Sequence, residues 1–172
     1  MRAGDREAYA ELVRRHAPVA LRAASLLGAG ADAEDVVQEA FFKAYARLDR
    51  YRDGAPFRPW LLRIVTNETR NLQRGAGRRR ERERVSWERT ERLLTSPGPL
   101  DSALSSERRR SLIRALRLLP ERDRQVVVCR YLMDLDERES ATVLGWPRGT
   151  VRSRLSRALR RLEALLEEES HG

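Results

Sequence analysis

The sequence predicts an all-α protein with two small helical domains joined by a flexible linker, the C-terminal domain containing a helix-turn-helix. Three observations support this prediction. Apolar residues recur at spacings of three and four along most of the 172 residues, which is typical of amphipathic helices. Alternating strand patterns bounded by turn residues are scarce. A segment rich in glycine, proline and serine divides the helical pattern near the middle of the chain.

The charge of the chain favours a polyanionic partner over an acidic small substrate. The formal net charge is +9, and Lys43 is the only lysine among the 35 basic residues. Genome base composition is one explanation of this preference for arginine, but arginine also supplies forked donors that suit phosphates and guanine edges. The net charge therefore indicates nucleic acid as a partner.

The single cysteine excludes an internal disulfide framework and a multi-cysteine zinc site. Cys129 lies in the apolar run of residues 126–129, so we expect a buried, unreactive thiol. The sequence shows no signal peptide and no membrane-spanning run. We therefore expect a cytoplasmic protein without direct membrane insertion.

The first predicted helix spans residues 5–27 and carries an apolar stripe. His16 lies within this helix, and no second metal ligand is near it in the sequence, so we expect a partly buried structural histidine. Residues 28–31 form a predicted turn, after which Asp32 is a good cap for the second helix.

The second predicted helix, about residues 33–48, has an unusual outer face. From Gly28 to Phe42 there are four acids and no basic residue, although the chain is strongly basic. The helix dipole explains acids in a first turn, but it does not explain the glutamine, glutamate and outward phenylalanine that follow. We therefore expect a protein-docking face made by Asp35, Gln38, Glu39 and Phe42.

The loop of residues 51–58 and the helix that Pro59 opens combine aromatic, arginine and asparagine side chains. The apolar residues of this helix, Trp60 among them, are expected to face a core. An unstacked base needs a pocket, a stacking surface and hydrogen-bonding side chains. The candidates for binding a single strand are Tyr51, Phe57, Arg58, Arg63, Asn67, Arg70, Asn71 and Arg74.

The composition changes abruptly at Gly75, where mixed charges and then glycine, proline and serine replace the earlier pattern. Residues 95–100 are expected to be flexible, whereas residues 78–94 can extend the third helix. The predicted organisation is a first domain at residues 1–80, a linker at residues 81–104 and a second domain at residues 105–172.

The second domain is predicted to begin with a serine cap at residue 105 or 106. Its first helix ends before Pro120, and a further helix spans residues 121–133. The residues expected to be buried in this further helix are Val127, Val128 and Tyr131, or their neighbours.

A helix-turn-helix is predicted over residues 136–166. Asp136 caps its first helix, Gly145 supplies the permissive backbone of the turn, and Pro147 falls on the first position of the second helix. Residues 148–161 contain six arginines and no acid, opposite a row of apolar residues at helical spacing. A helix-turn-helix needs this division, because its second helix packs on its own domain and also contacts the DNA major groove.

Two separated motifs in this order resemble segments of one protein family. Region two of bacterial sigma factors is similar to DAEDVVQEAF followed by FRPWLLRIVTN, and region four is similar to ALRLLPERDRQVVVCRYLMDLDERESATVLGWPRGTVRSRLSRA. Only a linker separates the two motifs, so the chain as a whole resembles an extracytoplasmic-function (ECF) sigma factor. The resemblance covers residues 5–80 and 111–165.

This resemblance implies that the chain binds core RNA polymerase and directs sequence-specific promoter recognition and transcription initiation. It implies docking of the second helix, through the four residues of its outer face, on the clamp helices of the largest polymerase subunit, with a further contact to the polymerase flap. It also implies an anti-sigma factor as a partner. No enzymatic activity, cofactor, metal or small-molecule substrate is expected.

The resemblance divides the DNA-binding residues between two promoter elements. The loop and the third helix would open the minus-10 element and capture an extruded base of the non-template strand, through the eight residues given above. The major groove of the minus-35 element is assigned to Arg148, Thr150, Arg152, Ser153, Ser156 and Arg157.

Three residues depart from the sigma-factor pattern. Ser140 replaces an aliphatic residue in the first helix of the helix-turn-helix, and Trp146 is bulkier than the usual residue of the turn. Leu61 stands where housekeeping sigma factors have a second tryptophan, which agrees with the ECF group.

The alternative is a stand-alone helix-turn-helix regulator with a helical N-terminal sensing or dimerisation domain. It explains the C-terminal motif equally well, but it gives no reason for the segments DAEDVVQE and WLLRIVTN. An enzyme is less favoured than either, because no nucleophile, base and orienting group fall together and no metal-ligand spacing exists.

Overall fold

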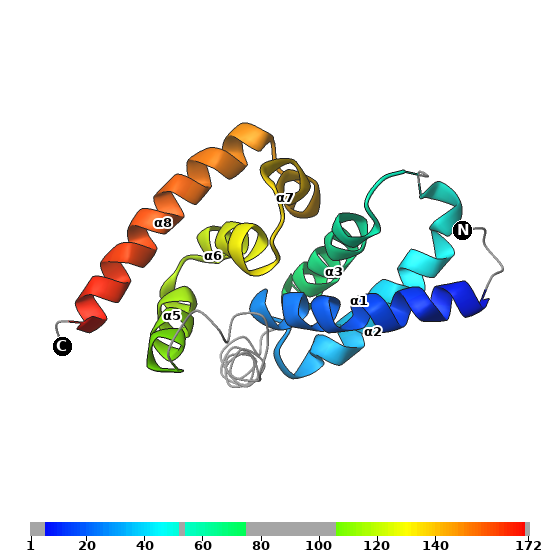
Figure 1. Cartoon of the computed structure of the whole chain (residues 1–172), viewed down its shortest axis with the longest axis horizontal. Helices are drawn as coiled ribbons and strands as arrows, with labels where there is room; N and C mark the ends of the chain where they lie inside the picture. Colours follow the sequence, from blue (N-terminus) through cyan, green and yellow to red (C-terminus); the bar gives the residue numbers. More distant parts are fainter. Residues whose placement is uncertain (1–5, 52–53, 75–105, 171–172) are drawn as a thin grey trace.

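The computed structural model describes residues 6–51, 54–74 and 106–170, and every regular element in these residues is helical. The helices form two groups (Figure 1). The first group contains α1 (Arg6–Leu26), α2 (Ala33–Ala46) and α3 (Phe57–Arg74). The second group contains α5 (Ser106–Leu118), α6 (Glu121–Val127), α7 (Glu137–Leu144) and α8 (Arg148–Ser170). The all-α prediction with two small helical domains is confirmed, whereas the predicted linker and both of its boundaries lie outside the described residues.

The three helices of the first group pack pairwise around one apolar core. Ala20, Ala23 and Ala24 at the end of α1 are buried, and their small side chains let the neighbouring helices approach closely. Phe41 of α2 and Leu61 of α3 fill the same core. The predicted apolar stripe of the first helix and the predicted core face of the third are therefore confirmed.

The ends of these helices differ in detail from the predicted ones. α2 ends at Ala46, and a 3-10 turn, η2 (Leu48–Arg50), replaces its predicted last turn. Asp32 precedes α2 but makes no capping hydrogen bond, because it ends another 3-10 turn, η1 (Gly30–Asp32), and lacks the extended backbone of a capping residue. α3 begins at Phe57, so Pro59 lies in its first turn, where the missing N–H costs no hydrogen bond.

In the second group Pro120 separates α5 from α6, as predicted. The predicted helix over residues 121–133 is interrupted by a π-helical turn, η3 (Val128–Leu132), in which Met133 N donates to the carbonyl of Val128 at 2.8 Å. This wider turn changes which side chains face the core. Val127 and Val128 are buried as predicted, and so is Met133. Tyr131 is 56% exposed, so its predicted burial is wrong.

The helix-turn-helix has the predicted caps. Asp136 Oδ1 accepts a hydrogen bond from Glu139 N at 2.7 Å, and Asp136 N donates to Glu139 Oε2 at 2.9 Å, which forms a capping box. Gly145 ends α7 with a φ of 69°, in the left-handed region that glycine adopts without strain. Ser140 is buried, and within the described ranges its hydroxyl has no hydrogen-bond partner, so this departure from an aliphatic residue leaves a buried polar group unpaired.

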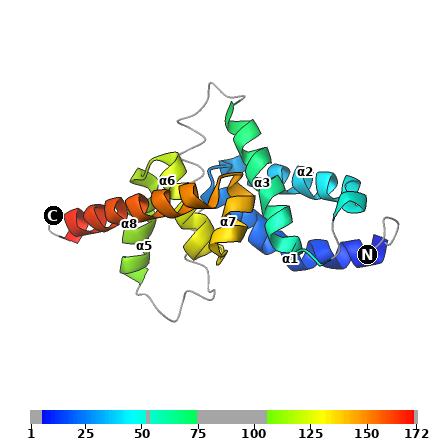
Figure 2. The same cartoon turned by 90° about the horizontal axis from the view of Figure 1, so that it is seen from above.

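The two groups of helices touch through α3 and α7, which pack against each other. Both views show α7 beside α3, while α8 leads away from the first group (Figures 1 and 2). The turn of the helix-turn-helix therefore lies near the helix that carries most of the predicted single-strand-binding residues.

Candidate functional site

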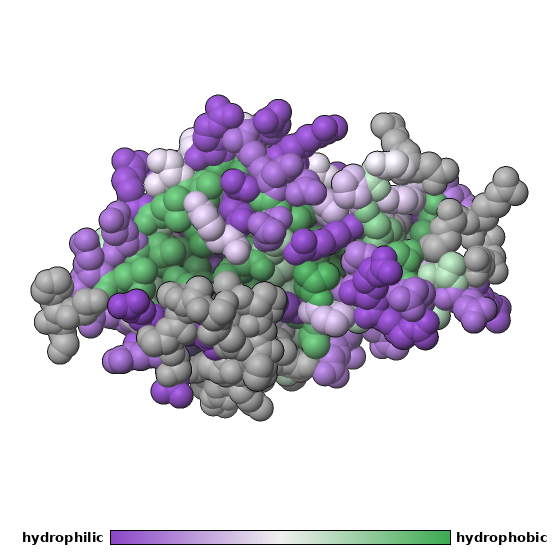
Figure 3. Space-filling view, in the orientation of Figure 1, coloured by the Kyte–Doolittle hydropathy of each residue, from purple (hydrophilic) through white to green (hydrophobic). Residues whose placement is uncertain are grey.

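The helix α8 has the two faces that the sequence predicts. Val151, Ala158 and Leu162 are buried. Figure 3 shows hydrophilic residues gathered at the top of the view, where α7 meets α8, and hydrophobic residues between α8 and α6. Of the residues assigned to a major groove Thr150 is half-buried, and the exposed ones are Arg148, Arg152, Ser153, Ser156 and Arg157.

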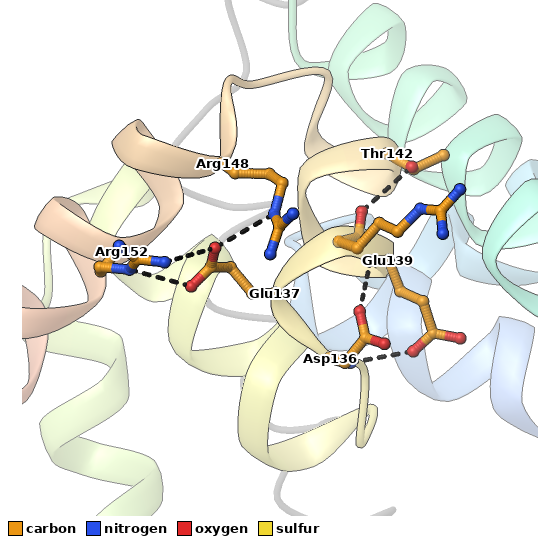
Figure 4. A network of polar contacts seen from close by, with 7 residues as sticks. Asp136, Glu137, Glu139, Thr142, Arg148 and Arg152 are labelled. Atoms are coloured by element: carbon orange, nitrogen blue, oxygen red, sulfur yellow. Dashed lines mark hydrogen bonds and ion pairs between the residues drawn. The ribbon is translucent and has the colours of Figure 1, made fainter.

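The first residue of α7, Glu137, contacts two of these arginines (Figure 4). Glu137 Oε1 accepts hydrogen bonds from Arg148 Nε at 3.2 Å and from Arg152 Nη2 at 3.1 Å. Glu137 Oε2 accepts from Arg152 Nε at 3.1 Å, so the second pair is bidentate. The hydrogen bond from Arg152, with the charges of both arginines, holds the pKa of the Glu137 carboxyl below its usual range.

Glu137 is absent from the predicted site residues. It lies 11 residues before Arg148 and 15 before Arg152, on a different helix. Helical periodicity places residues relative to their own helix only. The contact therefore depends on how the turn orients α8 against α7, which no spacing in the sequence reveals.

Asp123 of α6 holds α8 from its buried side, and it too is absent from the predicted residues. The residue is 1% exposed; its Oδ1 accepts from Arg154 Nη1 at 3.0 Å, and its Oδ2 accepts from Arg161. The guanidinium of Arg154 also lies over the ring of Trp146, 5.8 Å from the ring centroid, which gives the bulky turn residue a packing role. The sequence did contain a sign that Asp123 is buried, because Asp123 is three residues before the buried Val126 and so lies on the same helical face.

The outer face of α2 is exposed as predicted, and Phe42 is 65% exposed. The same face borders a groove of about 1100 Å³ between α1 and α2, lined largely by apolar side chains. Asp35, Gln38 and Phe42 line this groove, whereas Glu39 forms an ion pair with Lys43 at 3.5 Å. An exposed aromatic side chain beside an apolar groove is typical of a surface that binds an amphipathic helix.

Aromatic side chains gather where the loop joins α3. The ring centroids of Tyr51 and Phe57 lie 5.2 and 5.5 Å from that of Trp60, and Phe57 also contacts His16 at 5.0 Å. Burial, with the positive charges of Arg15 and Arg58, holds the pKa of His16 below its usual range. His16 is thus partly buried among packed rings, as expected, and Trp60 is only half-buried.

Four of the predicted single-strand-binding residues are exposed along one face of α3. They are Arg63, Asn67, Asn71 and Arg74. Successive members are four, four and three residues apart, so they line up on one side of the helix. Two amide groups with a guanidinium group at either end of such a row can contact base edges and a phosphate backbone together.

Two other predicted residues of this set contact the second group of helices instead. Arg70 Nη1 donates to the carbonyl of Leu144 at 3.1 Å, and its Nη2 donates to Gln125 Oε1 at 3.3 Å. Arg58 donates to the carbonyl of Met133. Burial lowers the pKa of Arg70 from its usual value. In this arrangement both guanidinium groups are covered by the second domain.

Other kinds of site find little support in the described part of the chain. No three histidine, cysteine or acidic side chains there lie close enough to hold a metal ion, and no helix there could span a bilayer. Cys129 is 1% exposed, and burial raises the pKa of its thiol to about 12, which confirms the buried thiol.

Comparison with known sequences gives a consistent result over both groups of helices. Residues 12–79 match the family Sigma-70 region 2, and residues 109–162 match the family Sigma-70, region 4. The ECF RNA polymerase sigma-E factor of Escherichia coli K12 is 36% identical over 161 residues, which cover 90% of this chain and 84% of that protein.

Two solved structures have a similar fold. CnrH, in complex with the cytosolic domain of CnrY, matches with a TM-score of 0.70 and 30% identity over 96% of this chain and 91% of the CnrH chain. The sigma factor RpoE of Bartonella quintana, co-crystallised with the anti-sigma factor NepR, matches with a TM-score of 0.66 and 26% identity over 91% of this chain and 97% of that one.

Proposed function

Since this chain belongs to the ECF family of RNA polymerase sigma factors, we propose that it binds core RNA polymerase in the bacterial cytoplasm and directs initiation at promoters with defined minus-10 and minus-35 elements. It acts by binding alone and catalyses no reaction of its own. One observation carries the proposal: a single chain exposes a non-basic docking face on α2 and a cationic face on α8. A stand-alone regulator needs only the second of these faces.

The second domain, residues 105–172, binds the minus-35 element as a duplex. α8 is long enough to lie in a major groove while Val151, Ala158 and Leu162 hold it on its domain. Arginine and serine side chains on its exposed face can donate to phosphates and base edges. The residues assigned to this contact are Arg148, Thr150, Arg152, Ser153, Ser156 and Arg157.

The first domain, residues 1–80, recognises the minus-10 element as a partly opened strand. The row of arginine and asparagine side chains on α3 supplies the hydrogen bonds, and the aromatic cluster at residues 51–60 lies at the start of that helix. Flipping out a base costs a few kcal/mol, which contacts to the base edge and to phosphates can offset. The residues assigned here are Tyr51, Phe57, Arg58, Arg63, Asn67, Arg70, Asn71 and Arg74.

The outer face of α2 docks on the clamp helices of the largest polymerase subunit. The exposed Phe42 and the apolar groove beside it suit a helical partner. The acidic side chains around them favour a partner helix with a basic surface. The residues assigned to this contact are Asp35, Gln38, Glu39 and Phe42. A further contact of the second domain with the polymerase flap completes the docking.

The described arrangement is a closed form that cannot bind the minus-10 element in full. Arg58 and Arg70 are both assigned to that element, yet both donate to carbonyls of the second domain. Promoter binding therefore requires the contact between α3 and α7 to break. Two similar structures are complexes, one with the cytosolic domain of CnrY and one with the anti-sigma factor NepR. We infer that an anti-sigma factor binds this chain too and stabilises its closed form.

The experiment that tests the proposal uses the full chain and purified core polymerase. We expect co-elution of the two in gel filtration, and run-off transcripts only when the chain is present, from promoters mapped in cells that overexpress it. Failure to bind core enzyme, or binding without initiation, overturns the proposal. Binding of a duplex by the chain as a dimer, without any affinity for core enzyme, favours the stand-alone regulator.

A further inference from the structure

We propose that Glu137 is a positioning residue that determines base specificity at the minus-35 element, by orienting Arg152 toward a guanine in the major groove. The inference rests on the proposed function, because it takes α8 as the helix that enters the groove. Glu137 belongs to α7 and contacts no base itself. Its effect on DNA is transmitted through the arginine side chains that it holds (Figure 4).

The hydrogen-bond geometry of Arg152 supports this role. A guanidinium group has two edges, each of which can donate a pair of parallel hydrogen bonds. Glu137 takes the edge formed by Nε and Nη2, with both N···O distances at 3.1 Å. The edge formed by Nη1 and the remaining N–H of Nη2 is not used by Glu137. The O6 and N7 atoms of guanine accept a pair of hydrogen bonds from such an edge.

Glu137 is well placed to restrain the arginine. It follows the capping residue Asp136 directly, so its backbone is held by the capping box, and its side chain is only 24% exposed. The Arg152 side chain is 74% exposed and would otherwise sample many rotamers. A side chain that is already oriented loses less conformational entropy when it binds. The restraint therefore favours a directional base contact.

The charge of Glu137 also favours base contacts over sequence-independent contacts. Its carboxylate lies beside the surface assigned to DNA and partly neutralises Arg148 and Arg152. Without it, both arginines could turn to phosphates, which are present in every sequence. Loss of Glu137 should therefore lower sequence discrimination and raise sequence-independent binding. Those two effects have opposite signs, and a general loss of structure would lower both.

The test uses holoenzyme assembled from core polymerase and the full chain. Its probe is a duplex library with randomised bases at the minus-35 element and a constant minus-10 element from a mapped promoter. Bound DNA is sequenced, and a duplex without promoter elements measures non-specific retention. The Arg152→Ala variant identifies the base position that depends on Arg152. Glu163→Gln is the matched control, because it removes the same charge from an exposed position of α8.

We expect Glu137→Gln to lower the guanine preference at that position by about fivefold, a fraction of what one bidentate contact provides, and to raise non-specific retention. Glu137→Asp keeps the charge but shortens the side chain, so we expect it to lower the guanine preference without raising non-specific retention. Glu163→Gln should leave the guanine preference unchanged.

Two results overturn the inference: an unchanged guanine preference in Glu137→Gln, or an equal loss in the Glu163→Gln control. Selection of no minus-35 sequence by the wild-type holoenzyme contradicts the proposed function instead. The two failures are therefore distinguishable. Thermal unfolding of each variant, measured alone, shows whether a lost preference reflects lost structure; an equal midpoint with a lower preference supports the positioning role.

Discussion

The guanidinium of Arg70 donates a hydrogen bond to the backbone carbonyl of Leu144 at 3.1 Å, across the junction between the two domains. Leu144 is the last residue of α7, and its carbonyl is one of the terminal acceptors that a helix leaves without an internal partner. The first domain therefore satisfies a helix end of the second domain. While this hydrogen bond is made, the Arg70 guanidinium is engaged by the second domain and is not available for the DNA contact proposed for it.

Arg70→Ala should open the chain. The variant loses two hydrogen bonds across the junction, each with a net contribution of about 1 kcal/mol, so the closed form loses population. We expect a larger radius of gyration in small-angle X-ray scattering. Arg63→Ala is the matched control, because Arg63 is exposed on the same helix. An unchanged radius for Arg70→Ala would show that this contact does not hold the domains together.

Phe42→Ala should weaken binding to core polymerase. Its side chain is 65% exposed beside the groove between α1 and α2, and truncation of an aromatic interface residue typically lowers affinity by about tenfold or more. Fluorescence anisotropy of the labelled chain titrated with core enzyme measures this change. Arg157→Ala, on the face assigned to DNA, should bind core enzyme as the wild type does; the reverse pattern would contradict both assignments.

Asn67→Ala should reduce capture of the opened strand. The loss of hydrogen bonds to an extruded base is expected to lower affinity by about tenfold, because the polar edge of the base would lose its partner on α3. The measurement is binding of wild-type and variant holoenzyme to a single-stranded non-template oligonucleotide that spans the minus-10 element. Affinity for core enzyme should stay constant, and an unchanged affinity for the oligonucleotide would remove Asn67 from the minus-10 site.

Asp123→Ala should destabilise the second domain. Asp123 is 1% exposed and pairs with Arg154, whose side chain is 23% exposed, so the substitution leaves a largely buried charge without its partner. We expect the free energy of unfolding to fall by about 3 kcal/mol in urea titrations. Asp49→Ala, at an exposed position, should change it by less than about 0.5 kcal/mol. Equal stability of the two variants would show that the buried ion pair contributes little.

Local patterns were sufficient for most of the fold because helices have a regular period. The buried row Val151, Ala158 and Leu162 and the exposed Phe42 follow from spacing alone. The caps at Asp136 and Gly145 follow from the chemistry of single residues. The prediction for Tyr131 was wrong, because periodicity assumes an α-helix and the chain widens there into a π-helical turn.

Sequence patterns alone predict a helical protein, a helix-turn-helix in its second domain, and the motifs of an ECF sigma factor. The partners of the charged side chains, in contrast, depend on how the helices pack. The pairing of Glu137 with Arg152, the buried site of Asp123 and the contact of Arg70 with Leu144 all join different helices. Such contacts depend on the orientation of one helix against another. Side-chain packing sets this orientation, and the period of a single helix does not predict it.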